Sequence, residues 1–177
     1  MGFIQLNVPV FENHTDIDFL RNVFLHEVMH LLAFSRTLYD HFPSQFVRLV
    51  EDHFVIQSGS TMSSFRDHLD CGTLGKLPVE NQIQNGCHFE KTLFGHELMT
   101  PNITARSVLS KFTLLFLEDT GWYRVDASLA EPFYWGLNQT CQFLKSSSAC
   151  EAPDLEEIHC QGKACGVESP PDSIDYR

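Results

Sequence analysis

The chain has 177 residues, 43% of them hydrophobic and 20% charged, which suits one ordinary globular domain, alone or with a small appendage. Its formal net charge of −11 argues against binding to nucleic acid or to an anionic membrane surface, because the phosphates of both would repel it. The sequence contains no run approaching the roughly 18–20 apolar residues that a membrane-spanning helix needs.

Cysteines and glycosylation motifs favour a secretory route. The six cysteines are Cys71, Cys87, Cys141, Cys150, Cys160 and Cys165. Asn-X-Ser/Thr motifs begin at Asn13, Asn102 and Asn138, and together with the cysteine-dense tail they favour an oxidising, extracellular or cell-surface location. The first residues lack the basic region and apolar core of a signal peptide, so we expect this sequence to be a portion of a longer precursor.

The first part of the chain predicts one strong helix. Residues 1–14 have the character of a strand followed by a loop. Thr15 is the expected N-cap of a helix that continues to about Leu32, with the acidic Asp16 and Asp18 in its first turn. The apolar residues of this helix recur at spacings of three and four, at Ile17, Leu20, Phe24, Val28 and Leu31.

The middle of the chain gives weaker signals. Residues 35–60 mix helix and loop character, with Pro43 as a breaker and a short helix expected over residues 46–50. Residues 57–90 are rich in Ser, Gly, Asn and Gln, which predicts a long and partly irregular surface segment.

A second helix is expected after Pro101, capped by Asn102 or Thr104 and ending before Gly121. Its apolar positions are Val108, Leu109, Phe112, Leu115 and Phe116. Residues 128–177 are rich in turns and cysteines, which predicts a small region stapled by disulfides.

The segment His26-Glu27-Val28-Met29-His30 falls inside the first predicted helix. Residues four apart share one face of a helix, so both imidazoles can reach a single metal ion, with Glu27 beside them. Zinc in such a site acidifies a bound water, and a carboxylate can take the proton and pass it to a leaving amine. The alternative is a chance match on an amphipathic helix, but two ring nitrogens on an apolar helix are difficult to bury without partners. We therefore expect catalytic zinc.

A catalytic zinc site needs a third protein ligand and an open position for water. The usual metzincin pattern places Gly three residues after the second His and the third His three residues further on. Those positions are occupied here by Ala33 and Arg36, and Arg does not bind zinc. The candidates that remain open downstream are His41, His53, His68, His88, His96 and Glu90.

Five ordered segments resemble the leishmanolysin family, including its invadolysin-like animal members, in the metzincin clan of zinc metallopeptidases. They are HEVMHLLAFS at 26–35, CGTLGKLPVENQ at 71–82, GCHFEKTLFGHELMTP at 86–101, LEDTGWYRVD at 117–126 and EPFYWGLNQTCQFL at 131–144. The resemblance implies that His88 is the third ligand and that Met99 forms the Met-turn beneath the zinc. It covers about residues 20–165.

The resemblance also implies a fold and an activity. The expected fold class is α+β, mainly α in this segment, with residues 1–127 forming the lower, zinc-carrying part of a metzincin catalytic domain and residues 128–177 starting a disulfide-rich C-terminal region. The implied activity is hydrolysis of internal peptide bonds of proteins, with one Zn²⁺ per chain and Glu27 as the general base. We expect protein or peptide substrates, a monomer, no nucleic acid, and membrane association only through a longer full-length protein.

Two other functions stay open from the sequence. One is a cell-surface adhesion or binding protein that retains the zinc site with weak or no proteolysis, since family members are associated with adhesion and migration as well. Glu27 argues against it, because a purely structural site needs ligands but no base. The other is a cytosolic metal-binding domain, which would require reduced cysteines.

Several residues depart from the family pattern or need a role. Ala33 stands where the family has a Gly, so we expect a left-handed turn there that is strained by about 1 kcal/mol. Cys87 is expected to form a disulfide, with Cys71 as its nearest partner in sequence, but six cysteines permit 15 pairings and the sequence does not choose among them. His96 is expected at the surface or beside the ligands. Packing roles are expected for the aromatic residues Trp122, Tyr123, Tyr134 and Trp135. About 25 residues precede the zinc motif, which implies that the upper subdomain of such a catalytic domain is missing here.

Overall fold

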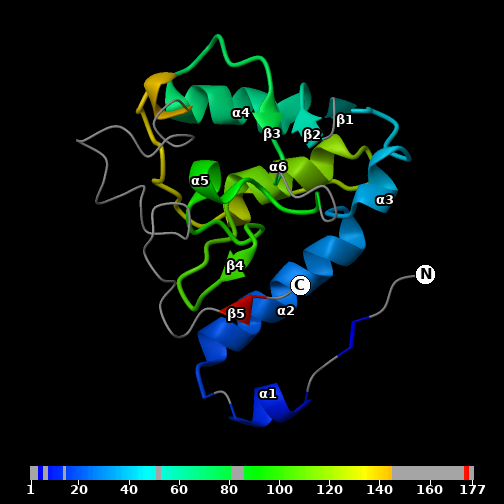
Figure 1. Cartoon of the computed structure of the whole chain (residues 1–177), viewed down its shortest axis with the longest axis vertical. Coiled ribbons are helices and arrows are strands. Elements are labelled where there is room, and N and C mark those ends of the chain that lie inside the picture. Colours follow the sequence, from blue (N-terminus) through cyan, green and yellow to red (C-terminus); the bar gives the residue numbers. More distant parts are fainter. Residues whose placement is uncertain are drawn as a thin grey trace.

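The computed structural model describes residues 4–5, 8–13, 15–50, 53–80, 86–144 and 174–175. It is a mixed α/β fold of helices and a small antiparallel sheet, which confirms the predicted class at this level. Figure 1 shows helix α4 (Gly59–Leu69) above helix α6 (Lys111–Asp119), with helix α2 (Ile17–Leu32) running obliquely below them. Among the described residues, no helix is both long enough and apolar enough to cross a membrane.

Helix α2 forms where the apolar spacing predicted it. Its N-cap is Asp16, whose carboxylate accepts a hydrogen bond from the Phe19 amide at 3.0 Å. The expected N-cap Thr15 was therefore wrong by one residue, because either side chain could serve and only the backbone geometry distinguishes them. The residues of α2 that are buried against the rest of the fold are Phe19, Asn22, Val23, His26 and Met29.

Before α2, the structure contains a short helix where the sequence predicted a strand and loop. Helix α1 spans Val8–Asn13. Pro9 lies in its first turn, where an amide proton has no helical partner, so the proline is tolerated there. The alternation of apolar residues in this region was too short to distinguish a strand from a single helical turn.

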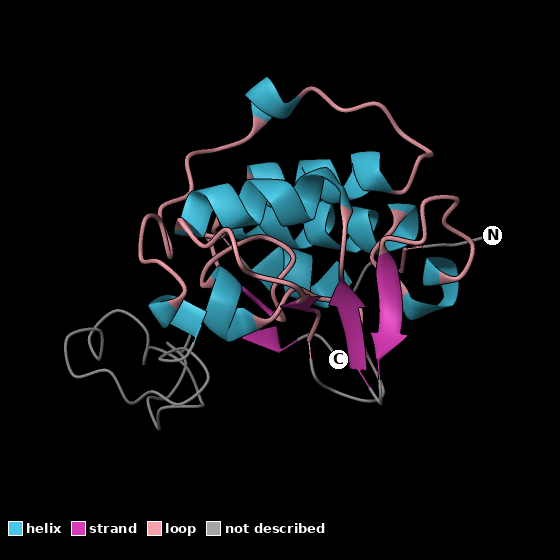
Figure 2. Ribbon diagram, turned by 90° about the horizontal axis from the view of Figure 1, so that it is seen from above, coloured by secondary structure: helices cyan, strands magenta, loops and turns pink. Residues whose placement is uncertain are grey.

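A three-stranded antiparallel sheet follows α2 and the one-turn helix α3 (Arg36–Tyr39). Strand β1 (Val47–Val50) pairs with β2 (His53–Ile56), and β2 pairs with β3 (Leu77–Pro78). The short helix expected over residues 46–50 is wrong: β-branched residues and a nearby partner strand favour pairing. Figure 2 shows these strands on one side of the helices.

Helix α4 replaces part of the irregular surface segment expected over residues 57–90. Its buried residues Thr61, Met62, Phe65 and Leu69 form one helical face. Asp119, at the end of α6, accepts hydrogen bonds from the amides of Ser60 and Thr61, both at 2.7 Å. A carboxylate there satisfies the free amides at the start of α4, so these two helices are joined end to end. The Ser- and Gly-rich composition concealed this helix.

Substituting Gly59 by alanine is expected to destabilise the fold by about 2–4 kcal/mol, because positive φ is strained for alanine and overpacking adds to the strain. Gly59 has a φ of +89°, and a Cβ there would lie 2.5 Å from the Asp119 carboxyl carbon. Asp119 cannot retreat without losing the amides that it caps. Chemical denaturation measures the difference. In the matched variant Gly75→Ala the new methyl meets nothing within 4 Å, so its stability should be unchanged; equal effects of the two substitutions would contradict the prediction.

Helix α6 begins later than expected. Its N-cap is Ser110, whose hydroxyl accepts a hydrogen bond from the Phe112 amide at 3.1 Å, and the expected caps Asn102 and Thr104 do not serve. Residues Asn102–Ile103 instead form strand β4, which pairs with β5 (Ile174–Asp175). The end of the helix before Gly121 was predicted correctly.

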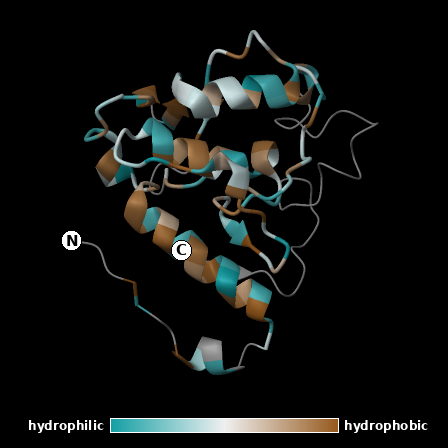
Figure 3. Ribbon diagram, turned by 180° about the vertical axis from the view of Figure 1, so that it is seen from behind, coloured by the Kyte–Doolittle hydropathy of each residue, from teal (hydrophilic) through white to brown (hydrophobic). Residues whose placement is uncertain are grey.

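The core is dominated by phenylalanine, of which the chain has 15. Figure 3 shows apolar residues along α6 and α2. The phenylalanines with at most 1% of their surface exposed are Phe19, Phe34, Phe42, Phe46, Phe65, Phe89, Phe94, Phe116 and Phe143. Tyr134, in contrast, is 71% exposed, so its expected packing role is wrong; Trp122 is 42% exposed but packs its ring against Phe42.

The disulfide expected between Cys71 and Cys87 is not formed. Cys71 is bonded to Cys141, and Cys87 is a free thiol. Proximity in sequence was a poor guide here, because the fold returns residues 133–144 to the end of α4, where the Thr140 amide donates to the Leu69 carbonyl. The 3₁₀ turn Ala127–Leu129 lies between α6 and this segment. Cys150, Cys160 and Cys165 lie outside the described residues, and the domain boundary at residue 127 stays a prediction.

Candidate metal centre

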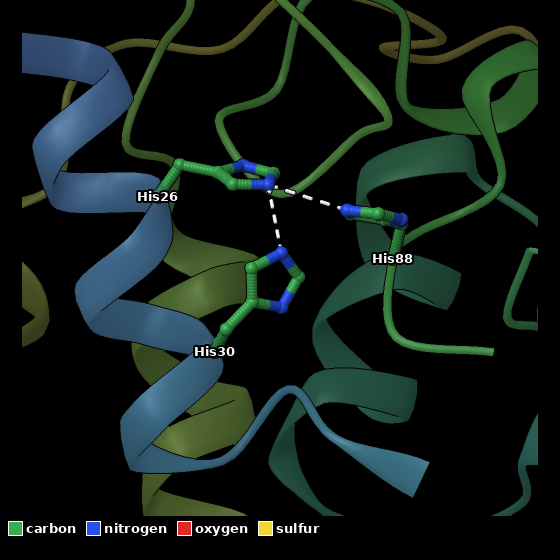
Figure 4. A group of neighbouring side chains, drawn as sticks. All are labelled: His26, His30 and His88. Atoms are coloured by element: carbon green, nitrogen blue, oxygen red, sulfur yellow. Dashed lines mark hydrogen bonds between the residues drawn. The ribbon is translucent and has the colours of Figure 1, made fainter. Parts of the chain in front are cut away.

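Three histidine side chains meet at one point. His26 and His30 project from adjacent turns of α2, and His88 reaches them from the segment before helix α5 (Lys91–Phe94), as Figure 4 shows. The Nε2 atom of His26 lies 2.8 Å from Nε2 of His30 and 3.2 Å from Nε2 of His88. Of the open candidates for a third ligand, the structure brings only His88 to this pair among the residues that it describes.

The sheet positions His88. After β3, Val79 forms an isolated antiparallel bridge with Phe89, and the Glu80 amide donates to the His88 carbonyl at 2.8 Å. Tyr39, which is fully buried, donates its hydroxyl proton to the Gly86 carbonyl at 2.7 Å. These backbone contacts hold the segment that carries His88 against α2.

The outer ring nitrogens determine the tautomers of the two helical histidines. Nδ1 of His26 lies 2.7 Å from the Leu98 carbonyl oxygen, and Nδ1 of His30 lies 2.8 Å from the Phe34 carbonyl oxygen. A carbonyl oxygen can only accept, so Nδ1 carries the proton in both rings. In a neutral ring Nε2 is then left with a free lone pair, and both lone pairs point into the centre.

The electrostatics keep these two rings neutral. Burial lowers the pKa of His26 to about 3, and burial together with the nearby His88 lowers the pKa of His30 to about 4. Two bare nitrogens 2.8 Å apart repel each other unless a cation lies between them. Tetrahedral zinc with Zn–N bonds of about 2.0–2.1 Å separates its nitrogen ligands by roughly 3.3 Å, close to the distances observed here. The donor set therefore fits a metal ion.

His88 differs because its outer nitrogen meets a carboxylate. Its Nδ1 lies 2.6 Å from Oε2 of Glu80, and both side chains are nearly buried. Burial lowers the pKa of His88, but hydrogen bonding to the Cys87 thiol and to Glu80 outweighs it and raises the pKa to about 9. A carboxylate behind a ligating histidine fixes the ring and increases its basicity. Neither Glu80 nor Tyr39 was found from the sequence, since no spacing rule marks them.

Glu27 lies on α2 between the two helical ligands and is partly buried. Burial raises the pKa of its carboxyl group, and the positive charge of His88 opposes this rise. Among the described residues, no hydrogen bond or ion pair engages its carboxylate, so the group is available to a water or a substrate. Its place beside the histidines is the one that the motif predicted.

The turn that contains Met99 lies directly beside the histidines. Met99 is fully buried, and its carbonyl oxygen accepts a hydrogen bond from the Phe89 amide at 2.8 Å. Its role as a Met-turn beneath a metal stays a prediction. His96 precedes this turn, but its ring packs against Phe133 at 5.5 Å and takes no part in the metal group.

The turn after α2 does not need a left-handed residue. Ala33 has a φ of −157°, and its amide donates to the Met29 carbonyl at 2.9 Å. The expected left-handed turn at Ala33 was therefore wrong, because the chain leaves the helix with a negative φ. The Phe34 carbonyl that follows is the one that orients His30.

Replacing Glu80 by glutamine is expected to weaken metal binding by roughly 10- to 100-fold, the usual effect of altering a partner behind a ligand. Glutamine can still accept the proton of His88 Nδ1, so the ring keeps a hydrogen bond but loses the negative charge. Competition with a chromophoric chelator measures the affinity. Glu90→Gln, on the same segment, changes a side chain that accepts a hydrogen bond from the Thr92 hydroxyl and should leave the affinity unchanged. Equal losses in the two variants would contradict a specific role for Glu80.

Known proteins are similar to this chain in sequence. The leishmanolysin family model matches residues 1–170. A leishmanolysin-like peptidase of Caenorhabditis elegans is 40% identical over 85 residues, which are 46% of this chain and 13% of the relative. Leishmanolysin of Leishmania amazonensis is 30% identical over 178 aligned residues, which cover 93% of this chain and 29% of the relative. This chain thus spans less than a third of the length of either relative, and it belongs to the leishmanolysin family.

Proposed function

We propose that this chain is a zinc-dependent metalloendopeptidase that hydrolyses internal peptide bonds of proteins. The observation that carries the proposal is the convergence of three imidazole nitrogens beside Glu27, which follows His26 on α2. Its carboxylate is partly buried and has no hydrogen bond or ion pair among the described residues. Membership of a family whose named relatives are peptidases supports it. A site that bound metal only for structure would have no use for Glu27.

Three imidazole nitrogens favour zinc over the harder cations. Calcium and magnesium prefer oxygen ligands, whereas imidazole nitrogen suits zinc and other late transition metals. Three protein ligands leave the fourth tetrahedral position open, as in catalytic zinc sites. We therefore propose one Zn²⁺ per chain, held by His26, His30 and His88, with Met99 in the turn beneath it.

The bound ion would polarise the scissile carbonyl and acidify a water molecule. The Glu27 carboxylate takes a proton from the attacking water, whose oxygen forms a bond to the carbonyl carbon. The same carboxyl group then delivers that proton to the amine nitrogen as the carbon–nitrogen bond breaks. Burial supports this exchange because it raises the pKa of Glu27 towards the range in which one group can both accept and release a proton near neutral pH.

The same proposal extends to the substrates, the location and the domain organisation of the chain. Substrates are proteins or peptides, and the chain acts as a monomer in the extracellular space or at the cell surface. Residues 1–127 form the zinc-carrying part of a metzincin catalytic domain, and residues 128–177 begin a disulfide-rich region. The cross-link between Cys71 and Cys141 supports an oxidising location.

The test is to measure zinc content and casein hydrolysis on the purified, oxidised full chain. We expect one zinc per chain, and hydrolysis that a chelator abolishes and added zinc restores. Zinc binding without hydrolysis would overturn the peptidase proposal while leaving the metal centre intact. Absence of stoichiometric zinc would overturn both.

A further inference from the structure

Glu97 is a carboxylic acid with no exposed surface, and nothing in the proposed reaction uses it. Its Oε2 accepts a hydrogen bond from the Met99 amide. Its Oε1 accepts from the Ser110 hydroxyl at 2.8 Å, the Ser110 amide at 3.3 Å and the Thr113 hydroxyl at 2.5 Å. Both carboxylate oxygens are therefore engaged, one by its own turn and the other by the start of α6.

Because it is buried, the carboxyl group of Glu97 stabilises the fold less than an apolar side chain of similar size would. Burial raises the pKa of Glu97 to about 7, and the hydrogen bonds from Thr113, Met99 and Ser110 oppose that rise. Among the described residues, no cationic side chain pairs with it. An apolar residue of similar size would avoid the desolvation of a carboxyl group. A buried acid at this place indicates that its hydrogen bonds are needed to position the surrounding backbone, which an apolar side chain could not do.

The turn held by Glu97 contacts the metal centre at two successive carbonyl oxygens. The Leu98 carbonyl accepts the Nδ1 proton of His26 at 2.7 Å, and this bond fixes the tautomer of that ring. The Met99 carbonyl accepts the amide of Phe89, the residue after His88, at 2.8 Å. A shift of residues 97–100 would therefore move one ligand through its side chain and another through its backbone.

The other end of the link is the buried start of α6. Ser110 caps α6 and also hydrogen-bonds to Glu97, so one hydroxyl serves both the helix and the carboxylate. Phe112 and Phe116 of α6 lie in the core with at most 3% of their surface exposed. The carboxylate thus connects the turn beside the histidines to a helix that is anchored in the core.

We propose that Glu97 is a positioning residue for the metal centre: it ties the turn of residues 97–100 to the start of α6 and so places the Leu98 and Met99 carbonyls that orient His26 and the His88 segment. This role rests on the proposed function in that it requires His26, His30 and His88 to bind a metal ion. It gives a reason for a buried acid beside the metal ligands that is not itself a ligand.

The test is Glu97→Gln in the full chain, with zinc affinity measured by chelator competition and the visible absorption of the Co²⁺-loaded protein as a second readout. The amide group has only one acceptor oxygen, so its NH₂ must face either the Met99 amide or the Ser110 amide. We expect zinc affinity to fall by about tenfold, as for other partners behind metal ligands, and the Co²⁺ bands to move. Thr113→Val removes one of the four donors and should shift both readouts in the same direction by less, which keeps the test decisive if Glu97→Gln fails to fold.

The matched control is Asp119→Asn. Asp119 is also a carboxylate whose two oxygens each accept a backbone amide, but it caps α4 and has no contact with the turn of residues 97–100. The control should lower thermal stability without changing zinc affinity or the Co²⁺ spectrum. Unchanged affinity and spectrum in both the Glu97 and Thr113 variants, with the wild type binding metal normally, would overturn the positioning role alone. Failure of the wild type to bind metal would overturn the proposed function and this inference together.

Discussion

Glu27→Gln is expected to lower the rate of peptide hydrolysis by roughly 10²–10⁴-fold while the chain keeps one zinc, because general acid–base catalysis typically contributes that much. Glutamine has nearly the shape of glutamate but cannot accept a proton from water. His26 and His30 keep their orientation, since the carbonyls of Leu98 and Phe34 orient them and Glu27 does not. The measurements are kcat on a peptide substrate and zinc content by atomic absorption.

The control for this variant is Glu118→Gln, an exposed acid on α6 that loses the same charge away from the histidines. It should retain full activity. Retention of more than about a tenth of the wild-type rate by Glu27→Gln would be incompatible with the general-base role assigned from the typical size of that effect. Loss of zinc in Glu27→Gln would show instead that the carboxylate supports the ligands.

His88→Ala is expected to abolish stoichiometric zinc binding and, with it, all hydrolysis. The two remaining histidines leave the ion with half of its tetrahedral positions unfilled by protein, and Glu80 with an unpaired charge in a nearly buried place. Metal that binds only the folded state also stabilises it, by about 2.7 kcal/mol at a free concentration 100 times the dissociation constant. A chelator should therefore lower the melting temperature of the wild type but not that of His88→Ala.

His96→Ala is the comparison that distinguishes the two histidines of this segment. Its ring contacts Phe133 and lies outside the metal group, so zinc content and the response to chelator should match those of the wild type. Zinc binding that survives in His88→Ala and disappears in His96→Ala would reverse the assignment of the third ligand.

Periodicity located the elements whose packing is simple. The spacing of Ile17, Phe24 and Leu31 identified α2 to within a residue or two at each end. It failed for α4, because the three serines and the polar residues of that helix dilute the apolar signal and its buried face becomes evident only against α6. It failed also for β1, whose four residues become a strand through their pairing with β2.

The site residues that lie close together in the sequence could be predicted, and those that lie far apart could not be predicted from local patterns. His26, Glu27 and His30 follow from one short motif on one helix, and the structure brings the two histidines of this motif together. His88 lies 58 residues after His30 in the sequence. Only family resemblance separated it from the other candidates, because no local rule links residues joined by tertiary structure.

The supporting groups were not predictable at all. Glu80 and Glu97 act through distances that only the fold defines, and their immediate sequences contain nothing that separates them from ordinary surface acids. The disulfide failed for a related reason: Cys141 meets Cys71 because residues 133–144 return to α4, which a count of residues along the chain does not reveal.

The cross-link between Cys71 and Cys141 closes a loop that contains His88, Glu97 and α6, but neither His26 nor His30. With 70 residues between its ends, such a bond removes chain entropy from the unfolded ensemble that corresponds to about 4 kcal/mol. The segment that carries His88 therefore has fewer conformations open to it before the protein folds. Helix α2, which carries His26 and His30, lies outside the loop and packs against this segment on folding. The redox state of the surroundings therefore determines how many conformations the segment around His88 can adopt whenever the protein unfolds.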